Sequence, residues 1–346
     1  MMKRILSVMM AVMLVFSMTA CSAKKQTAET DATASASKKN GEAESVSTEM
    51  EGSSEQNETA ENKTVNLELM PLEEALAELG LEEQPKSVAI TSLSASRLAY
   101  KLGLPIAAIP DTIAKEIEEL STLPTLGTAH TPNYEQIVAV DADLVLFEAM
   151  FKDSANDVIT EQNIPAYFVN CNLYDNVLHV VEVLGVAFGK EDVVKEIITD
   201  YNTRTAEALA MAEGREAPSV MILFGSTQSY MIGSEYTFLG DLAKKLGAVN
   251  ITGAMGIDDA TAKGGFLPLS EENAIAANPD YILCLGHGSE EMQALFEEKF
   301  TKNEAWSGVT AIKEGNIVYL DSSLFGTNGG IHAIDSLSAL AEILYQ

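Results

Sequence analysis

The stretch "EDVVKEIITDYNTRTAEALAMAE", residues 191–213, reads as one uninterrupted helix of about six turns. Its apolar side chains recur mostly at spacings of three and four, and Gly214 follows as a stop signal. These apolar residues are Val194, Ile197, Ile198, Tyr201, Leu209 and Met211. A flexible hinge between two domains would instead need two or three crossings that contain Gly or Pro. We therefore interpret residues 189–216 as a stiff bridging helix between two lobes that move little.

Short apolar runs alternate with amphipathic segments on both sides of the bridging helix. This alternation predicts α/β lobes, each with a parallel sheet covered on both faces. Before the bridge, we expect strands at Ser87–Thr91, Ile106–Ile109, Leu144–Phe147 and Ala166–Asn170, and helices at Ala95–Leu102, Tyr134–Val140 and Ala155–Gln162. After it, we expect strands at Ser219–Phe224, Tyr230–Ile232, Tyr281–Leu285 and Ile317–Leu320, and helices at Thr237–Leu246, Glu271–Ala277, Met292–Phe300 and Ala333–Leu344. The predicted fold is two Rossmann-like lobes, residues 66–188 and 217–346.

The start of the chain has the pattern of a bacterial lipoprotein signal peptide. Lys3 and Arg4 precede an apolar run that is too short to span a membrane. Cys21 follows directly on Met18-Thr19-Ala20, which resembles a lipobox and predicts cleavage after residue 20 and lipidation of the Cys21 thiol. The alternative is an ordinary signal peptide with a chance cysteine. We expect an extracytoplasmic protein that is anchored to the cell membrane.

Residues 22–65 are rich in Ser, Thr, Ala, Glu and Lys and contain no aromatic residue. Such a segment cannot bury enough apolar surface to offset its ordering entropy. We therefore predict that residues 21–65 are the lipidated cysteine and a disordered tether, with a root-mean-square reach of roughly 35–40 Å.

The formal net charge of −29 limits the classes of partner. A chain this acidic is a poor candidate for binding nucleic acid or an anionic lipid surface. Beyond Cys21, the two cysteines are Cys171 and Cys284, each in or beside a predicted strand. We expect both to be buried free thiols rather than a disulfide or a metal site.

Two of the four histidines lie where an α/β fold binds ligands. His130 lies in "LGTAHTPNYEQIVAVDADLVL", residues 126–146, and His287 follows the strand Tyr281–Leu285 in "CLGHGS", residues 284–289. Ligands of open α/β sheets bind beyond the carboxyl ends of the strands. One histidine from each lobe would then face the interlobe cleft, although both could equally be solvated loop residues. His332, in "NGGIH", is a further candidate near the cleft, or else caps the last helix, and His179 reads as part of a helix face.

Two opposed imidazoles suit haem iron better than a bare metal ion. Zinc or manganese would need a third or fourth protein ligand, whereas a porphyrin leaves only the axial positions to the protein. Apolar walls could come from several residues that could also be ordinary core, namely Phe147, Met150, Phe151, Met231, Met255, Phe266 and Phe325. Ser92, Ser94 and Ser96, at a helix start, could donate hydrogen bonds to the propionates.

The sequence contains none of the catalytic motifs that we considered. It has no Gly-x-Ser-x-Gly elbow and no phosphate-binding Gly-Lys-Ser/Thr loop, and Cys284 falls inside a predicted strand rather than beside a base. We expect a binding protein and no enzyme activity.

Several stretches resemble one family in order and spacing across residues 66–346. They are "GTAHTPNYEQIVAVDADLVL", "GSTQSYMIGSEYTFLGDLAKKLGAVNI", "NPDYILCLGHGSEEMQALFEEKF" and "FTKNEAWSGVTAIKEGNIVYLDSSLFG". The chain resembles class III periplasmic binding proteins, the substrate-binding lipoproteins of iron, haem and corrinoid ABC importers, and within them the haem receptors of the iron-regulated surface determinant type. The resemblance implies that haem is bound as the transported ligand and delivered to an ABC permease and its ATPase, with upstream haem-donor proteins as further partners.

The resemblance also implies roles for individual residues. In the family a Met of the first lobe and a His of the second hold the iron. The His corresponds to His287, and the Met position is occupied here by His130, so we expect bis-histidine ligation. Family members dock on the permease through one carboxylate per lobe, and the matching residues are Glu135 and Glu272; without the resemblance each would read as a solvated residue favoured by the helix dipole.

Two other functions remain open at this point. A transport receptor of the same architecture could bind a ferric siderophore or a corrinoid, although an anionic siderophore would favour more Arg and Lys than this chain has. A tetrapyrrole-processing enzyme such as a chelatase also uses two lobes and a cleft histidine. The export signal and the tether argue against that enzyme.

Overall fold

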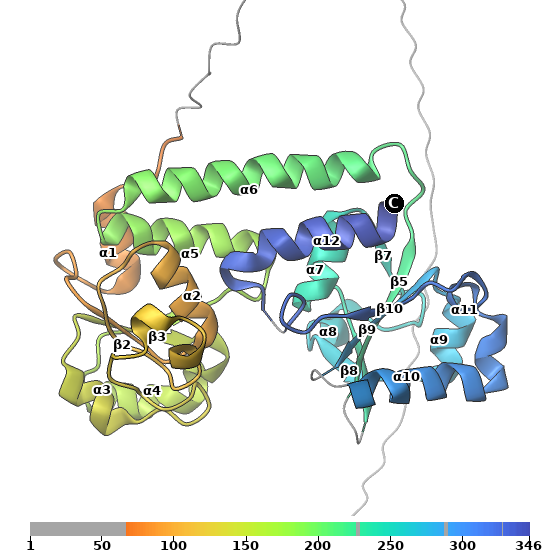
Figure 1. The fold of residues 1–346 in the computed structure, drawn as a ribbon, viewed down its shortest axis with the longest axis horizontal. Coiled ribbons are helices and arrows are strands. Elements are labelled where there is room, and N and C mark those ends of the chain that lie inside the picture. Colours follow the sequence, from red (N-terminus) through yellow and green to blue (C-terminus); the bar gives the residue numbers. More distant parts are fainter. Residues whose placement is uncertain (1–66, 226–228, 287–289, 327) are drawn as a thin grey trace, which may run out of the picture. The chain divides into compact units, whose positions relative to one another are not determined.

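The computed structural model describes residues 67–225, 229–286, 290–326 and 328–346 (Figure 1). The predicted signal peptide (1–20), Cys21, the tether and His287 lie outside the described residues. Within the described part, no helix is long and apolar enough to cross a membrane.

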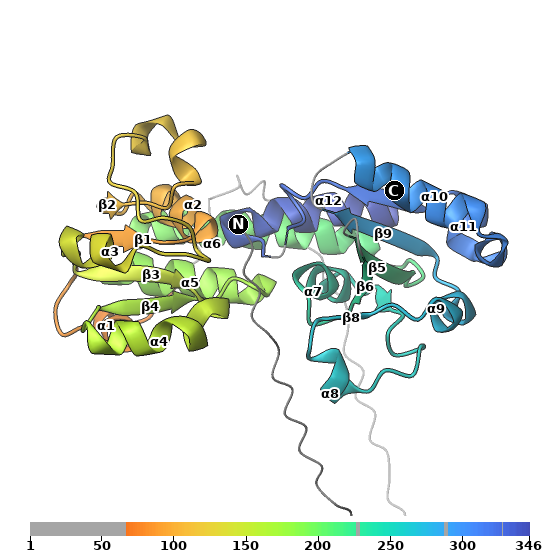
Figure 2. The same ribbon diagram turned by 90° about the horizontal axis from the view of Figure 1, so that it is seen from below.

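The first sheet is parallel throughout, as predicted, with the strand order β2-β1-β3-β4. Its strands lie side by side in Figure 2 and are β1 (Val88–Ile90), β2 (Ile106–Ala108), β3 (Leu144–Glu148) and β4 (Ala166–Val169). The helices that accompany it are α1 (Leu72–Leu79), α2 (Leu93–Lys101), α3 (Tyr134–Val140), α4 (Lys152–Glu161) and α5 (Tyr174–Ala187). Helix α1 was not predicted, and α4 begins three residues before the predicted start.

Helices cover both faces of this sheet, because alternate side chains of β1 and β3 enter different cores. Val88 and Leu146 belong to one apolar cluster with residues of α1, α2 and α5. Ala89 and Val145 belong to another cluster, with residues of α3 and α4. The loop between β2 and α3 contains two short 3-10 helices, Ile113–Lys115 and Glu118–Leu120.

The second sheet is mixed, which corrects the prediction of a wholly parallel sheet. Its order is β10-β9-β5-β6-β8, with β7 beside β5, and β6 is antiparallel to both β5 and β8. The strands are β5 (Ser219–Gly225), β6 (Tyr230–Gly233), β7 (Val249–Asn250), β8 (Phe266–Pro268), β9 (Tyr281–Gly286) and β10 (Ile317–Leu320). Only four residues separate β5 from β6, too few for the crossover that a parallel pair needs.

The helices of the second lobe divide between the two faces of its sheet. Ile222 and Leu283 share a core with α7 (Phe238–Lys245) and α12 (Ala333–Tyr345). Met221 and Ile282 share another with α9 (Glu271–Ala277), α10 (Glu290–Lys302) and α11 (Thr310–Glu314). The short helices α8 (Asp259–Ala262), Glu304–Gly308 and Gly330–His332 complete the lobe. As predicted, Cys171 and Cys284 are buried free thiols.

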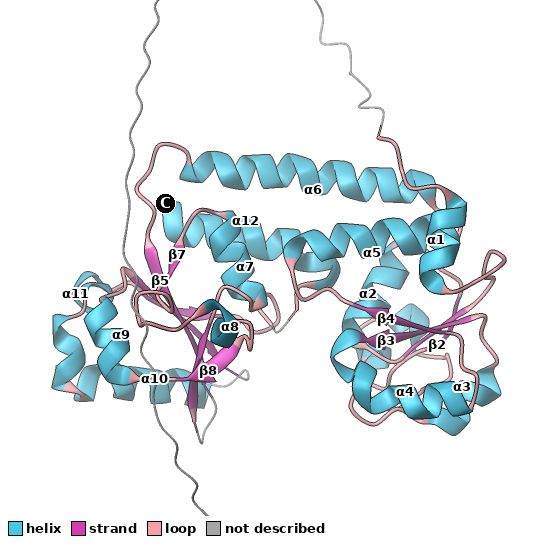
Figure 3. Cartoon of the chain, turned by 180° about the vertical axis from the view of Figure 1, so that it is seen from behind, coloured by secondary structure: helices cyan, strands magenta, loops and turns pink. Residues whose placement is uncertain are grey.

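Helix α6 (Glu191–Ala212) is a long helix that follows the first sheet and precedes the second sheet in the sequence (Figures 1 and 3). It contacts α5 of the first lobe and α12 of the second. Tyr201 is buried, and its hydroxyl group donates a 2.6 Å hydrogen bond to the carbonyl oxygen of Ile331. Leu209, which was expected on the apolar face, is 39% exposed. The fold is therefore two α/β lobes joined by a single long helix.

Candidate functional site

His130 lies at the tip of a tight turn that precedes α3. Thr128 and Thr131 bracket the turn: the Thr131 amide donates to the Thr128 carbonyl oxygen at 3.1 Å, and their hydroxyl groups lie 2.9 Å apart. Gly127 has φ +79°, and a Cβ there would lie 2.6 Å from the Thr131 carbonyl oxygen. This glycine therefore lets the chain close the turn. The local hydrogen bonds hold the backbone of His130 while its side chain remains exposed.

The imidazole of His130 contacts the ring of Phe151, which follows the carboxyl end of β3. The ring centroids are 4.8 Å apart and the ring planes make an angle of 64°. Phe151 ends the short 3-10 helix Ala149–Phe151, directly before α4. In the same helix Met150 is 68% exposed, a large apolar side chain open to solvent. The exposed imidazole of His130 thus packs on Phe151, and the exposed Met150 precedes Phe151 in the chain; we call these three residues the His130 wall.

A buried carboxylate, Glu148, ends β3 beside this wall. The Ser94 hydroxyl group donates to its Oε2 at 2.9 Å, and Asn328 Nδ2 donates to its Oε1 at 2.8 Å. Burial raises the pKa of the Glu148 carboxyl, and the hydroxyl groups of Ser92 and Ser94 partly offset that rise. Sequence reasoning missed Glu148 and Asn328, because their contact joins residues far apart in the chain.

The segment 328–332 crosses from the second lobe to the first, and we call it the strap. Gly330 packs against Ser94, where an added Cβ would lie 3.3 Å from the serine Cβ. Ile331 accepts the hydrogen bond from Tyr201 on α6 described above. The consecutive glycines 329 and 330 were the local signal that could have indicated this close approach.

The three serines predicted to bind propionates each form a hydrogen bond within the first lobe. Ser92 caps α2 by accepting from the Ala95 amide, and the buried Ser96 donates to the Ser92 carbonyl oxygen. Ser94 donates to Glu148. Helix caps and anion sites use the same residue types, and the sequence could not tell them apart.

Two of the predicted wall residues belong to the core. Phe147 is 2% exposed and packs between Tyr134 and Phe168, and Phe325 is 3% exposed in the core beside α12. The contact of Phe147 and Phe325 with a ligand stays a prediction. Met231 on β6 is half-buried and is paired in register with Phe224 of β5.

The second predicted ligand follows a strand end that the structure does describe. β9 ends at Gly286, which is paired in register with Gly225 at the end of β5. His287 comes next in the chain and lies outside the described residues.

The other two histidines form hydrogen bonds away from the His130 wall. His332 precedes α12 and its Nδ1 lies 3.0 Å from Asp335 Oδ2. It lines a cavity of about 660 Å³ between α6 and the strap, together with Arg204, which pairs with Asp335 at 2.7 Å. His179 is exposed on α5 and its Nε2 lies 3.0 Å from Glu78 Oε1.

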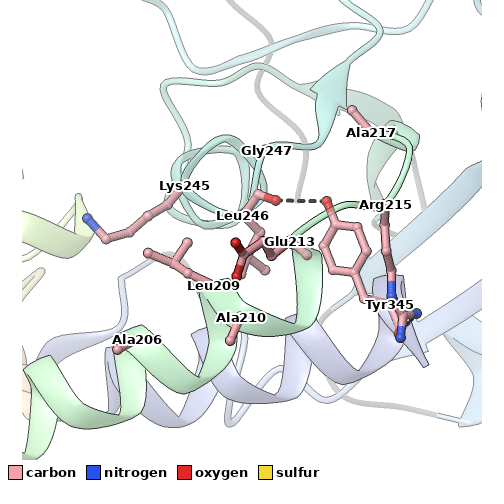
Figure 4. Close-up of a pocket in the computed structure, with 11 residues that line it drawn as sticks. Ala206, Leu209, Ala210, Glu213, Arg215, Ala217, Lys245, Leu246, Gly247 and Tyr345 are labelled. Atoms are coloured by element: carbon pink, nitrogen blue, oxygen red, sulfur yellow. Dashed lines mark hydrogen bonds between the residues drawn. The ribbon is translucent and has the colours of Figure 1, made fainter. Parts of the chain in front are cut away.

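A separate cavity of about 570 Å³ lies between the end of α6, α7 and α12 (Figure 4). Leu209, Arg215 and Tyr345 are among its lining residues, and Tyr345 closes one side through a 2.7 Å hydrogen bond from its hydroxyl group to the Leu246 carbonyl oxygen. Of the predicted site residues that the structure describes, none lines it.

Glu135 and Glu272 occupy equivalent places in the two lobes. Each is an exposed residue in the first turn of a seven-residue helix, α3 or α9. Both helices end at a residue in the left-handed conformation, Asp141 (φ 52°) and Asn278 (φ 48°). The two carboxylates therefore occupy corresponding positions on a repeated structural unit.

The strands next to these helices repeat the same hydrogen-bonded clamp. In the first lobe Ser87 Oγ donates to Asp143 Oδ2 at 3.1 Å and accepts from the Asp143 amide. In the second lobe Ser219 Oγ donates to Asp280 Oδ2 at 2.7 Å and accepts from the Asp280 amide. The two lobes thus use the same local device, which supports the equivalence of Glu135 and Glu272.

Comparisons with known proteins agree on the fold. The periplasmic binding protein family model matches residues 88–324. The high-affinity heme uptake system protein IsdE of Staphylococcus aureus (strain MRSA252) is 26% identical over 259 residues, which cover 74% of this chain and 86% of IsdE.

Two solved structures have similar folds. A Listeria monocytogenes EGD-e ABC transporter substrate-binding protein has a TM-score of 0.67 and 25% identity over 76% of this chain and 99% of its own. S. aureus IsdE complexed with heme has a TM-score of 0.65 and 24% identity over 75% of this chain and 99% of its own. The matched family consists of substrate-binding proteins, which are not enzymes. Because the family model covers both lobes and α6, the chain belongs to the periplasmic binding protein family.

Proposed function

We propose that this protein binds haem between its lobes and delivers it to an ABC importer. The observation that carries the proposal is the His130 wall, where an exposed imidazole on a braced turn packs against Phe151, which the exposed Met150 precedes in the chain. An iron porphyrin needs axial donors set in apolar surroundings, and this wall offers both. The resemblance to a protein named for heme uptake supports the same ligand.

His130 and His287 are the proposed axial ligands, one from each lobe. His287 follows the end of β9, where α/β folds bind their ligands. Bis-histidine ligation would lower the reduction potential of the iron relative to methionine–histidine ligation, because imidazole donates more strongly than a thioether.

Delivery requires the protein to be close to a permease. We propose that Glu135 and Glu272 dock on the permease, supported by their exposed and equivalent positions. Lipidation of Cys21 would anchor the protein to the cell membrane, with residues 22–65 as a tether. The permease, its ATPase and an upstream haem donor are the expected partners.

The decisive test is selective binding. The purified protein is titrated with ferric haem, with a ferric siderophore and with cobalamin, while absorbance is recorded. A saturable one-to-one shift of the Soret band, with no saturable response to the other two ligands, is the expected result. Saturable binding of the siderophore or the corrinoid without binding of haem would overturn the proposal in favour of that ligand.

A further inference from the structure

We propose that Phe151 is a positioning residue, which fixes the plane of the His130 imidazole. The effect on iron rests on the proposed function, whereas the effect on the imidazole itself does not. The supporting geometry is the pair of rings 4.8 Å apart at 64°, between two segments that are both held in place.

The backbone of each partner is restrained by hydrogen bonds of its own. On the His130 side, the Thr128–Thr131 turn is closed by backbone and hydroxyl hydrogen bonds. On the other side, the Phe151 carbonyl oxygen accepts a 2.9 Å hydrogen bond from the Ser154 hydroxyl group. Three residues before Phe151, Glu148 is tied to Ser94 and Asn328. Two restrained backbones therefore determine where the two rings meet.

A fixed backbone does not by itself orient an exposed histidine. The imidazole can rotate about its two side-chain torsions, and the torsion next to the ring has a broad preference. An edge-to-face contact with an aromatic ring favours one range of that torsion. Phe151 is half-buried, so its ring is itself restrained and can transmit that preference to His130.

The orientation of the imidazole plane affects both the affinity for haem and the electronic state of the iron, because the imidazole would be an axial ligand. A preset plane lowers the entropy lost on ligation and sets the asymmetry of the field at a low-spin ferric iron. An aromatic pair contributes enough that removing it should weaken haem binding by about 2- to 12-fold. The haem should remain low-spin, since the ligand atom is retained.

The first experiment needs no haem. The imidazole resonances of His130 are measured by NMR in the wild-type protein, Phe151→Leu and Phe168→Leu. Phe168 is a half-buried ring of the same lobe that packs on Phe147. We expect the His130 resonances to move in Phe151→Leu, through loss of the ring current, and not in Phe168→Leu. Unchanged resonances in Phe151→Leu would overturn the inference.

The second experiment uses the ferric haem complex. Phe151→Leu should change the electron paramagnetic resonance g-values of the low-spin iron and weaken binding by about 2- to 12-fold. Phe151→Tyr, which keeps the ring, should restore both, and Phe168→Leu should change neither. Wild-type g-values and affinity in Phe151→Leu would refute a role at the iron. If the wild type binds no haem, the proposed function fails while the NMR result still decides whether Phe151 contacts His130 in solution.

Discussion

Asn328 Nδ2 donates a 2.8 Å hydrogen bond to Oε1 of Glu148, a residue 180 positions earlier in the chain. The amide lies in the strap of the second lobe, and the carboxylate ends β3 of the first lobe. This contact joins the lobes at the carboxyl end of the first sheet, one residue before the 3-10 helix that ends at Phe151. Together with the hydrogen bond between Tyr201 and Ile331, it connects the lobes in addition to α6 itself.

Removing the side-chain amide of Asn328 should destabilise the folded protein. Asn328→Ala leaves one oxygen of the buried carboxylate without its described donor, and should lower the free energy of unfolding by about 1–3 kcal/mol. Urea unfolding measures the change. Asn202→Ala, at an exposed position on α6, is the control and should change stability little. Equal stability of Asn328→Ala and the wild type would show that the contact is not formed in solution.

The buried Glu148 carboxyl predicts a pH dependence with a definite sign. Burial raises its pKa in the folded protein above the ordinary value of 4.5. The unfolded chain therefore loses this proton first as pH rises, so the contribution of Glu148 to the free energy of unfolding falls between pH 4.5 and the raised pKa. Glu148→Gln cannot ionise and should gain stability relative to the wild type across that interval. A difference between the two proteins that does not vary with pH would contradict the raised pKa.

The strap leaves no room for a side chain at Gly329. A Cβ there would lie 2.3 Å from Phe238 Cζ and 2.7 Å from Ala333 Cβ. Gly329→Ala should therefore lower the free energy of unfolding by about 1–3 kcal/mol and, by moving Asn328, also weaken haem binding. Gly253→Ala is the matched control, since a Cβ there meets nothing within 4 Å. Wild-type unfolding and haem affinity in Gly329→Ala would show that the strap tolerates displacement.

Docking can be separated from ligand binding. Glu135→Ala and Glu272→Ala should each reduce haem uptake by cells several-fold, and the double variant more, while the purified proteins bind haem as the wild type does. Glu74→Ala removes another exposed first-turn glutamate, from α1, and should leave uptake unchanged. Normal uptake by the double variant would remove both residues from the proposed docking surface.

The regular elements were predictable because their signals are local. The periodicity of α6, and the position of Asn133 as the N-cap of α3, depend only on neighbouring residues. Strand direction is not local: β6 was predicted as a strand, but its antiparallel direction was missed although the short connection to β5 indicated it.

The features of the candidate site also differ in whether their signals are local in the sequence. The turn that presents His130 could be recognised from its Gly, Thr and Pro residues, whereas the contact between Glu148 and Asn328 depends on tertiary structure. The burial of Phe147 and Phe325 also depends on tertiary structure, because residue type alone does not distinguish a ligand wall from a core.

The most direct test of the central claim is the spin state of the ferric haem complex in the wild type, His130→Ala and His287→Ala. His179→Ala is the control, because His179 is an exposed histidine that bonds Glu78 on α1. The account predicts a low-spin, six-coordinate spectrum for the wild type and His179→Ala, and a high-spin or weakened complex for both other variants. A wild-type low-spin spectrum that survives in His130→Ala and in His287→Ala would contradict bis-histidine capture of haem.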